Sequence, residues 1–398
     1  MALTINTNVN SLTAQRNLST SQSSLSTSLQ RLSSGLRVNS AKDDAAGLAI
    51  AERLNSQVRG LNVASRNAND GISLAQTAEG ALGKVTDSLQ RIRELAVQSS
   101  NATNSADDRK ALQNEVSQLR DEIDRVAKTT TFNGTKLLDG SLTGATFQIG
   151  AGSGENITIA SLTNATSGKL SNVTYGSNDL ANISTGALTT LTAIADGALK
   201  ITVGTTEYSL SGVAAANSAD QRLGQVAEAI NRRTADTGVT AYLSKQTDGQ
   251  YALAFRSSKV DSAGAAEAVS FGGGFTVAAT GFADGSVSIA STTVTGVDAL
   301  TVTTTEDAWL AIKQVDNALD QVNSARATLG AVQSRFEAAV SNIAIQAENT
   351  SAARGRIVDA DFASETASLS RAQVLQQAGT AIVAQANQLP QQVLKLLQ

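Results

Sequence analysis

The sequence predicts a mainly α protein whose two ends form a coiled coil and helical bundle, with a β-rich α+β domain inserted between them. The first observation is a pair of long, proline-free segments with heptad-spaced apolar residues, one near each end of the 398-residue chain. The second is a middle segment rich in Thr, Ser, Gly and Ala, without that period. Each apolar stripe must be buried on another helix or another molecule, so the pattern indicates assembly and not a pocket.

The N-terminal stripe predicts one long helix from about Asp44 to Ser99. The residues on its seven-residue register are Leu54, Leu61, Ala68, Ala75, Leu82, Leu89 and Ala96. The sequence from Ser40 to Asp43 resembles a capping box that would start this helix. Five glycines lie within it: Gly47, Gly60, Gly71, Gly80 and Gly83. These glycines are either simply tolerated or let another backbone approach, and we favour close packing because several lie beside the apolar stripe.

A second helix and a C-terminal stripe should complete the bundle. Ser105 and Asp108 can cap a helix that runs to about Lys128. The C-terminal stripe consists of Ile312, Val315, Leu319, Val322, Leu329, Val332, Phe336, Val340 and Ile343. We predict a shared bundle core of Leu54, Leu61, Leu82, Leu89, Leu112, Leu119, Ile123, Leu319, Val322, Leu329 and Phe336.

The two extreme ends read as amphipathic helices with polar but mostly uncharged faces. We predict that their apolar residues make the assembly contacts: Leu18, Leu25, Leu29, Leu32, Leu36, Val374, Leu375, Ile382, Leu389, Val393, Leu394, Leu396 and Leu397. Helices in proteins draw most of their stability from packing, so we expect the N-terminal segment to be disordered in the monomer and to order on assembly.

After Lys128 the sequence period changes to that of strands and turns. Asn133-Gly134 and Asp139-Gly140 are turn signals, and residues 146–149 and 157–159 read as a pair of strands. Further strand candidates are 199–203, 206–210, 239–243, 251–255 and 287–289, with one helix at 220–232. We predict an inserted α+β domain, with disorder of part of it as the alternative.

The composition argues against most catalytic chemistry. The chain has no cysteine and no histidine, which removes thiol chemistry, the commonest general base and the commonest zinc ligand. We therefore expect no enzyme, no cofactor and no metal site, although carboxylate-only hydrolysis remains conceivable. The paired acids Asp43-Asp44, and Asp359 with Asp361, are interpreted as helix caps. Aromatic residues make up only 3%, so we expect small and aliphatic side chains to supply the packing.

Charge and hydropathy bear on partners and location. With a net charge of −4, the sequence shows no basic patch of the kind that binds nucleic acid. No run of about 18 apolar residues is present for membrane insertion. The first ten residues lack the pattern of a secretory signal, which indicates either the cytosol or an export route without a leader.

Both ends closely resemble bacterial flagellin. The resemblance lies in RLSSGLRVNSAKDDAAGLAI at 31–50, NANDGISLAQTAEGA at 67–81, LQRIRELAVQ at 89–98, TTFNGTKLLDG at 130–140 and SRAQVLQQAGTAIVAQANQLPQQVLKLL at 370–397. It covers roughly the first 160 and the last 95 residues. The middle resembles no flagellin domain that we could place.

The resemblance implies three domains. Residues 1–43 and 354–398 would form an inner terminal coiled-coil domain. Residues 44–165 and 305–353 would form the helical bundle and β-hairpin of the filament core. Residues 166–304 would be a variable, surface-exposed α+β domain.

The resemblance also implies a function. The chain would be a structural subunit that polymerises with itself into the extracellular flagellar filament used for swimming. Subunits would be exported unfolded through the flagellar type III apparatus, without a cleaved signal peptide. An export chaperone, the filament cap and the hook-junction proteins would be further partners. A hook–filament junction protein and an adhesive middle domain are the rival interpretations, and an enzyme is the weakest.

Two motifs resemble sites that host innate immune receptors recognise in flagellins. Arg91, Leu95 and Glu115 match positions bound by a Toll-like receptor, and the simpler interpretation is a set of surface charges and a filament contact. Leu394, Leu396 and Leu397 match C-terminal leucines read by a cytosolic receptor, and the simpler interpretation is coiled-coil packing. Lys395 and Gln398 depart from the usual family pattern beside those leucines.

Overall fold

The computed structural model describes residues 7–245, 250–285 and 289–396, and within these it leaves the side chains of 181–182, 245 and 389–396 undescribed. The chain forms two compact units. The first unit comprises Met1–Gly71, Thr146–Ile157 and Arg335–Gln398, and the second comprises Ile72–Ala145 and Thr158–Ser334. Two long helices contribute to both units: α2 (Ala45–Ser99) and α7 (Thr305–Val358). The three-domain division expected from the sequence stays a prediction.

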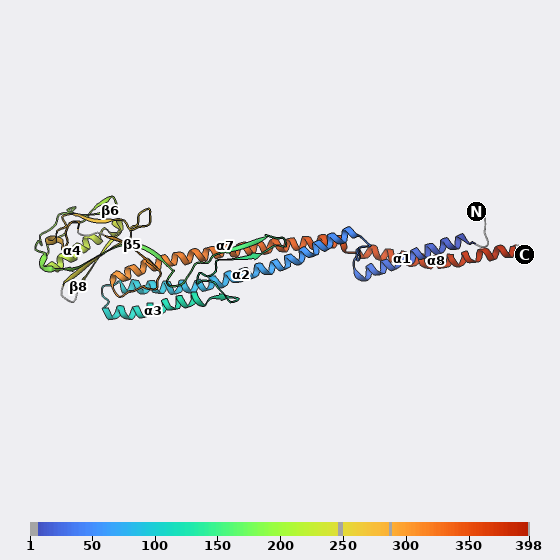
Figure 1. Ribbon diagram of the computed structural model, residues 1–398, viewed down its shortest axis with the longest axis horizontal. Helices are drawn as coiled ribbons and strands as arrows, with labels where there is room; N and C mark the ends of the chain where they lie inside the picture. Colours follow the sequence, from blue (N-terminus) through green and yellow to red (C-terminus); the bar gives the residue numbers. More distant parts are fainter. Residues whose placement is uncertain (1–6, 246–249, 286–288, 397–398) are drawn as a thin grey trace. The chain divides into compact units, whose positions relative to one another are not determined.

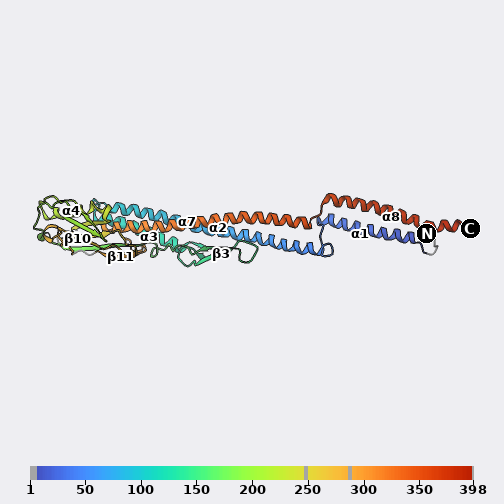
Figure 2. The same cartoon turned by 90° about the horizontal axis from the view of Figure 1, so that it is seen from above.

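The first unit contains helices α1 (Val9–Ser34) and α8 (Phe362–Leu396), which lie side by side and antiparallel in both views (Figures 1 and 2). Asn8 begins α1 by accepting a hydrogen bond from the Ser11 amide at 3.1 Å. Gly35 ends α1 in the left-handed conformation, with φ of 70°, and its amide bonds the Arg31 carbonyl. Glycine adopts this conformation without a Cβ clash, so it provides a clean helix stop.

A β-hairpin packs against the first unit's parts of α2 and α7. The hairpin pairs β3 (Gly144–Gln148) with β4 (Asn156–Ala160). Phe147 meets Phe336 edge to face at 5.5 Å, and a Cβ on Gly71 would lie 2.7 Å from the Phe336 ring. A Cβ on Gly60 would lie 3.0 Å from that of Ala151 in the hairpin turn. The predicted close approach of another backbone is therefore confirmed at Gly60, whereas Gly71 makes room for the Phe336 side chain.

The same prediction is wrong for the other three glycines of α2. A Cβ on Gly80 or Gly83 would meet nothing within 4 Å, so the helix merely tolerates them. A Cβ on Gly47 would meet only Asp44, whose carboxylate accepts a hydrogen bond from the Gly47 amide at 2.8 Å. The α2 helix thus begins at Ala45 under an Asp44 cap, while Asp43 closes a separate turn with the amide and hydroxyl of Ser40.

The second unit has a three-helix core made by α3 (Ala106–Thr129) with its parts of α2 and α7. The buried side chains include Leu82, Leu89, Ile92, Leu95, Val116, Ile123, Val315, Val322 and Leu329. The predicted capping box of α3 is present, because Ser105 and Asp108 exchange hydrogen bonds. After α3, the hairpin of β1 (Thr131–Phe132) and β2 (Thr135–Lys136) turns at Asn133 and Gly134, whose φ values of 49° and 80° suit a type I′ turn.

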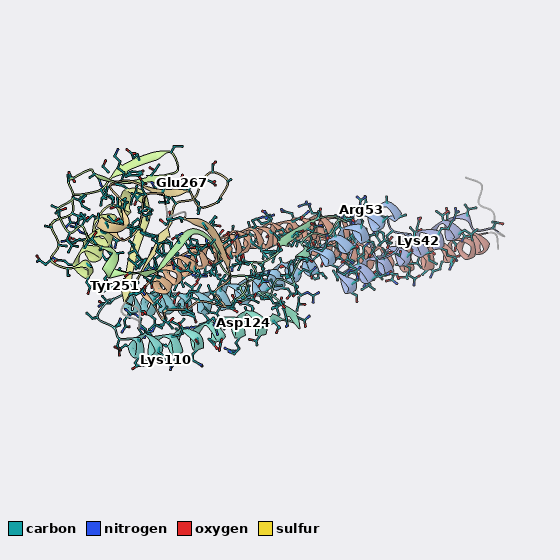
Figure 3. All side chains as sticks on the ribbon, turned by 60° about the vertical axis from the view of Figure 1, so that its left-hand side comes forward. Lys42, Arg53, Lys110, Asp124, Tyr251 and Glu267 are labelled. Atoms are coloured by element: carbon teal, nitrogen blue, oxygen red, sulfur yellow. The ribbon has the colours of Figure 1, made fainter. Side chains whose placement is uncertain are left out.

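Four residues of the predicted bundle core are only half-buried, namely Leu54, Leu112, Leu119 and Leu319, as are Ile312 and Val340 of the C-terminal stripe. Charged side chains such as Lys42, Arg53 and Lys110 point away from their segments into solvent (Figure 3). The second unit also contains the middle segment, which forms two antiparallel sheets.

The larger sheet has the strand order β11-β5-β9-β8, and the smaller has the order β10-β6-β7. Their bounds are β5 (Asn172–Ile183), β6 (Leu199–Val203), β7 (Thr206–Ser209), β8 (Val239–Lys245), β9 (Tyr251–Ser257), β10 (Val269–Gly273) and β11 (Ala290–Thr295). The short helical elements are η1 (Thr185–Ala187), α4 (Ala219–Asn231), α5 (Thr234–Thr237) and α6 (Val277–Thr280). Helix α4 packs on β8.

A phenylalanine cluster forms the centre of the middle segment. The rings of Phe255, Phe271, Phe275 and Phe282 lie 4.8 to 5.6 Å apart, and all four are buried. The expectation that small and aliphatic side chains supply the packing is wrong here, because half of the chain's eight phenylalanines gather at this one place.

The strand predictions for the middle segment are confirmed in part. The candidates at 199–203, 239–243 and 251–255 lie in β6, β8 and β9, and the candidate at 206–210 is β7 except for its last residue. The helix predicted at 220–232 is α4, with each end shifted by one residue. Strands β5, β10 and β11 were not predicted. The candidate at 287–289 lies almost entirely outside the described residues. The described part of this segment has an ordered core, so disorder is not needed to explain its composition.

Candidate assembly surface

The seam between α1 and α8 follows a heptad pattern made largely of small residues. The inward positions of α1 are Ser11, Ala14, Leu18, Ser21, Leu25, Ser28 and Leu32, spaced alternately by three and four. Those of α8 include Ala372, Gln376, Gly379, Val383 and Ala386. Leu18 packs over Gly379, where a Cβ would lie 3.2 Å from the leucine Cδ1. Small residues let two helices approach closely, but they bury little apolar surface.

Polar bonds at the far end of the pair set its register. The Ser11 hydroxyl donates a hydrogen bond to the side-chain oxygen of Asn387 at 2.7 Å. The side-chain NH₂ group of Asn8 donates to the Ala386 backbone carbonyl at 2.7 Å. Near the opposite end, Arg31 lies 3.8 Å from Glu365. Sequence reasoning missed these partners because it followed the leucines; serine and alanine on the same heptad positions were the available signal.

Large apolar side chains of the helix pair remain exposed. On α8, Val374, Leu375 and Ile382 keep 64%, 51% and 56% of their surface in solvent. Phe362 on α8, and Val9, Leu12 and Leu29 on α1, are likewise at or near half exposure. We call these seven residues the α1–α8 apolar surface. Several large apolar side chains exposed along one helix pair make this surface a candidate interaction site.

The structure separates the predicted assembly residues into two groups. Leu18, Leu25 and Leu32 lie on the seam within one chain, and Leu36 pairs with Asp359 in a short bridge beyond it. Leu29, Val374, Leu375 and Ile382 point outward. The side chains of Leu389, Val393, Leu394, Leu396 and Leu397 lie outside the described part, as does the predicted cytosolic-receptor motif. The assembly role of all these residues stays a prediction.

Arg91 and Glu115 form an exposed ion pair in the second unit, joining α2 to α3. The Arg91 Nε donates to Glu115 at 2.8 Å, and another guanidinium nitrogen donates to Glu94 at 2.9 Å. The bond to Glu115, and then that to Glu94, raises the pKa of Arg91. Leu95 differs from its two companions, because it is 1% exposed within the three-helix core. The three residues therefore do not form one exposed patch.

One acid of each predicted pair, Asp44 and Asp361, caps a helix in the structure, whereas Asp43 closes a turn and Asp359 lies in a bridge with Leu36. Besides Asp44, the Asp361 carboxylate accepts a hydrogen bond from the Ala363 amide at 3.0 Å at the start of α8. Across residues 7–245, 250–285 and 289–396, no cluster of three or more acidic side chains is arranged to hold a metal ion. Within the same ranges, no helix has both the length and the apolar character to cross a membrane.

Comparisons with protein families match three parts of the chain. Residues 5–143 match the bacterial flagellin N-terminal helical region, and residues 312–397 match the flagellin C-terminal helical region. Residues 198–259 match the flagellin hook IN motif, which spans β6 to β9. The middle segment therefore does carry a family motif, and the expectation that it resembles no flagellin domain is wrong.

Individual relatives match over the whole chain. The chain is 42% identical to the B-type flagellin of Pseudomonas aeruginosa and 44% identical to flagellin B of Vibrio cholerae, with all of each protein covered. Among solved structures, FliC from Burkholderia pseudomallei is 26% identical, with a TM-score of 0.38, over 67% of this chain and 99% of that one.

Proposed function

The chain belongs to the bacterial flagellin family, and from this premise we propose that the α1–α8 apolar surface holds neighbouring subunits together in the filament. The protein is a structural subunit of the flagellar filament and not an enzyme. As a filament subunit it is extracellular.

The observation that carries the proposal is the arrangement of residues on the helix pair. Small residues and three leucines of α1 occupy the seam within one chain, and Val374, Leu375 and Ile382 project outward. One chain alone thus leaves large apolar side chains of α8 in water, and further copies can cover them. A head-to-tail contact that does not close on itself generates a helical filament. The entropic cost of ordering the two chain ends would be offset by burial of this apolar surface.

Truncation tests whether the two ends drive assembly. Removing residues 1–35 or 360–398 should leave a folded monomer that does not polymerise. Electron microscopy after seeding with filament fragments measures polymerisation, and circular dichroism confirms the remaining helices. The full-length chain, purified and seeded in parallel, is the matched control. Filaments formed by either truncated chain would contradict the proposal.

We also propose the export route and partners that the family suggests. Subunits would leave the cell unfolded through the flagellar type III apparatus with an export chaperone, and would meet cap and hook-junction proteins at the filament ends. The absence of cysteine is compatible with passage as an unfolded chain, because no disulfide can lock a folded state. Secretion that continues at the normal level without a working flagellar export apparatus would contradict this route.

Receptor recognition is proposed for the exposed pair of Arg91 and Glu115. Both side chains are about half exposed, and a guanidinium offers several directed donors to a partner. Arg91→Ala should reduce Toll-like receptor signalling, whereas Arg125→Ala should not; Arg125 is the matched control because it is also exposed and paired with an acid, Glu122. Equal signalling by the two variants would contradict the assignment. Leu95 would act only by packing beneath the pair.

Recognition of the C-terminal leucines by a cytosolic receptor stays a separate proposal. Replacing Leu394, Leu396 and Leu397 together by alanine should abolish signalling through that receptor in cells that take up the protein. The Arg91→Ala variant is the control, because it should leave cytosolic signalling unchanged. Full signalling by the triple variant would contradict the proposal.

A further inference from the structure

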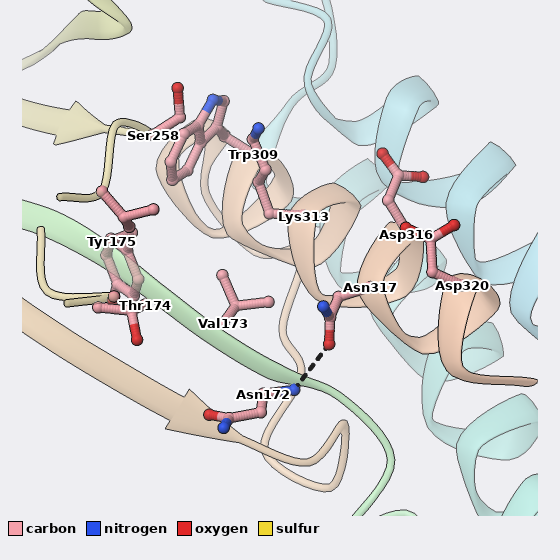
Figure 4. A pocket seen from close by; sticks show the side chains of 12 residues that line it. Asn172, Val173, Thr174, Tyr175, Ser258, Trp309, Lys313, Asp316, Asn317 and Asp320 are labelled. Atoms are coloured by element: carbon pink, nitrogen blue, oxygen red, sulfur yellow. Dashed lines mark hydrogen bonds between the residues drawn. The ribbon is translucent and has the colours of Figure 1, made fainter. Parts of the chain in front are cut away.

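An open cleft of about 400 Å³ lies in the second unit between the first turns of α7 and the beginning of β5. Figure 4 shows Trp309, Lys313, Asn317 and Asp320 along α7, with Asn317 pointing toward Asn172 of β5. These positions follow one another by three or four residues, which places them on one helical face. The volume falls in the range of small-molecule sites. Neither the assembly contacts nor the immune motifs use this cleft.

One wall of the cleft is aromatic. Trp309 is the only tryptophan of the chain, and its ring meets that of Tyr175 at 6.1 Å with an interplanar angle of 64°. Tyr175 is buried and Trp309 is only half-buried, so the tyrosine supports the indole from one side while part of the indole stays accessible. A supported, partly exposed indole is a rigid apolar platform with one hydrogen-bond donor.

The same face of α7 also carries hydrogen-bonding groups that line the cleft. The side-chain oxygen of Asn317 accepts a hydrogen bond from the Asn172 backbone amide at 2.8 Å. This bond fixes the direction of the Asn317 side-chain NH₂ group. Within the described ranges, that NH₂ group, the Lys313 ammonium and the Asp320 carboxylate have no hydrogen-bond or ion-pair partner in the protein. Donors and an acceptor are thus both available a few residues from the indole.

The charges of the cleft balance. Asp316 pairs with Arg93 at 2.7 Å, and Lys313 and Asp320 are of opposite sign. The site therefore lacks the clustered cations that an anion such as phosphate needs. It also lacks the excess of carboxylates and the second exposed ring that would favour a quaternary ammonium ion. An aromatic platform beside both donors and an acceptor, with little net charge, suits an uncharged molecule rich in hydroxyl groups.

We propose that this cleft is a carbohydrate-binding site for a neutral hexose unit. One face of the sugar ring covers the Trp309 indole. Its hydroxyl groups accept hydrogen bonds from Lys313 and Asn317 and donate to Asp320. The sugar is either a free monosaccharide or the end of a longer glycan, because both present the same ring to the cleft.

Intrinsic fluorescence provides a direct assay, because all tryptophan emission of the full chain comes from Trp309. Monomeric protein is titrated with methyl glycosides of glucose, galactose and N-acetylglucosamine, and with oligosaccharides ending in each. Inorganic phosphate and choline are the comparison ligands. We expect a saturable emission shift with at least one neutral sugar, with a dissociation constant on the order of 1 mM for a single ring. Tighter binding by the oligosaccharide would identify a longer glycan as the ligand.

Variants of the polar groups test the assignment to this cleft. Asp320→Ala and Lys313→Ala should each weaken binding by about tenfold, since each removes a charge-assisted hydrogen bond. Asp87→Ala is the matched control, because Asp87 is an exposed acid on α2 outside the cleft. Trp309→Phe, followed by calorimetry, should also weaken binding while the thermal midpoint shows that the fold is kept.

Three results would overturn the proposal. The first is no saturable shift with any neutral sugar up to about 100 mM, a hundred times the expected constant. The second is binding by the Asp320 and Lys313 variants that equals binding by the Asp87 variant. The third is saturation by phosphate or choline at lower concentration than by every sugar. None of these results depends on whether the protein polymerises, so the test is independent of the proposed assembly contacts.

Discussion

Replacing three outward-facing residues of α8 should weaken polymerisation and leave the monomer folded. The change is Val374→Ser, Leu375→Ser and Ile382→Ser in one chain. Each side chain keeps more than half of its surface in solvent in the single chain. Complete burial of such a side chain contributes about 1.5–3 kcal/mol, so burial of the exposed part in a filament contributes about 1 kcal/mol each. The three together contribute about 3 kcal/mol per subunit, which corresponds to a factor on the order of 100 in an equilibrium constant.

The assay is the critical concentration for seeded polymerisation, measured by sedimentation of the polymer at several protein concentrations. We expect the triple variant to need about a hundredfold more protein than the parent chain. The monomer should lose no more than about 1 kcal/mol of stability, because exposed sites contribute little and serine is a weaker helix former than leucine. Thermal unfolding of the monomer measures that loss.

A matched triple variant separates apolar burial from changes to the helix. Gln373→Ser, Gln377→Ser and Gln385→Ser change three exposed polar residues of the same helix. This control should keep a critical concentration within severalfold of the parent value. An unchanged critical concentration in the apolar variant, or an equal rise in both variants, would refute the reasoning.

Three further predictions concern the stability of the two units. Phe336→Ala should cost about 3–5 kcal/mol in urea unfolding, because the ring is fully buried, and a loss below about 1 kcal/mol would contradict that packing. The hydrogen bond from Ser105 lowers the pKa of Asp108 below its ordinary value of 3.8. The capping stabilisation should therefore be complete above that value and disappear as the pH falls through the lowered pKa. Asp108→Asn should remove this part of the pH dependence of unfolding between about pH 2 and 5. Arg93 and Asp316 join α2 to α7 while about half exposed, so a double-mutant cycle with alanine should give a coupling below about 1 kcal/mol, and a value above 2 would show a pair that solvent does not screen.

The helices were predictable from the sequence because their signals are local and periodic. The long helix expected from about Asp44 to Ser99 runs from Ala45, and the Ser105–Asp108 cap begins α3. Heptad spacing and capping chemistry depend on residues a few positions apart, so a single sequence contains them. The same holds for β6, whose alternating Leu199, Ile201 and Val203 face the core.

The missed strands lack such a signal. Strand β5 reads NVTYGSNDLANI, with a glycine and three asparagines, and it becomes a strand because it lies between β11 and β9 in the sheet. Pairing with distant strands outweighs its low β-propensity. The phenylalanine cluster was missed for a related reason, because an overall aromatic content of 3% says nothing about where the aromatic residues gather.

The location of the helix pair α1 and α8 was predictable from the sequence, but the direction in which each apolar side chain faces was not. Leucine spacing located α1 and α8 correctly, but the sequence alone did not show that Leu18 and Leu25 face the partner helix while Leu29 faces solvent. That distinction depends on which stripe packs against the partner helix, and here the small residues on the seam allow a close approach, as at Gly379. The carbohydrate cleft had no sequence signal, because Tyr175 and Trp309 meet only through the tertiary fold.

Thiol accessibility tests the central claim most directly, because the chain has no cysteine of its own. Single-cysteine variants at Leu375 and Ile382 are labelled with a maleimide as monomers and as filaments, with Asp87→Cys as the exposed reference. The account predicts fast labelling of all three monomers and strong protection of the two α8 positions in filaments. Labelling of those positions that is as fast in filaments as in monomers would contradict the claim that this surface is buried on assembly.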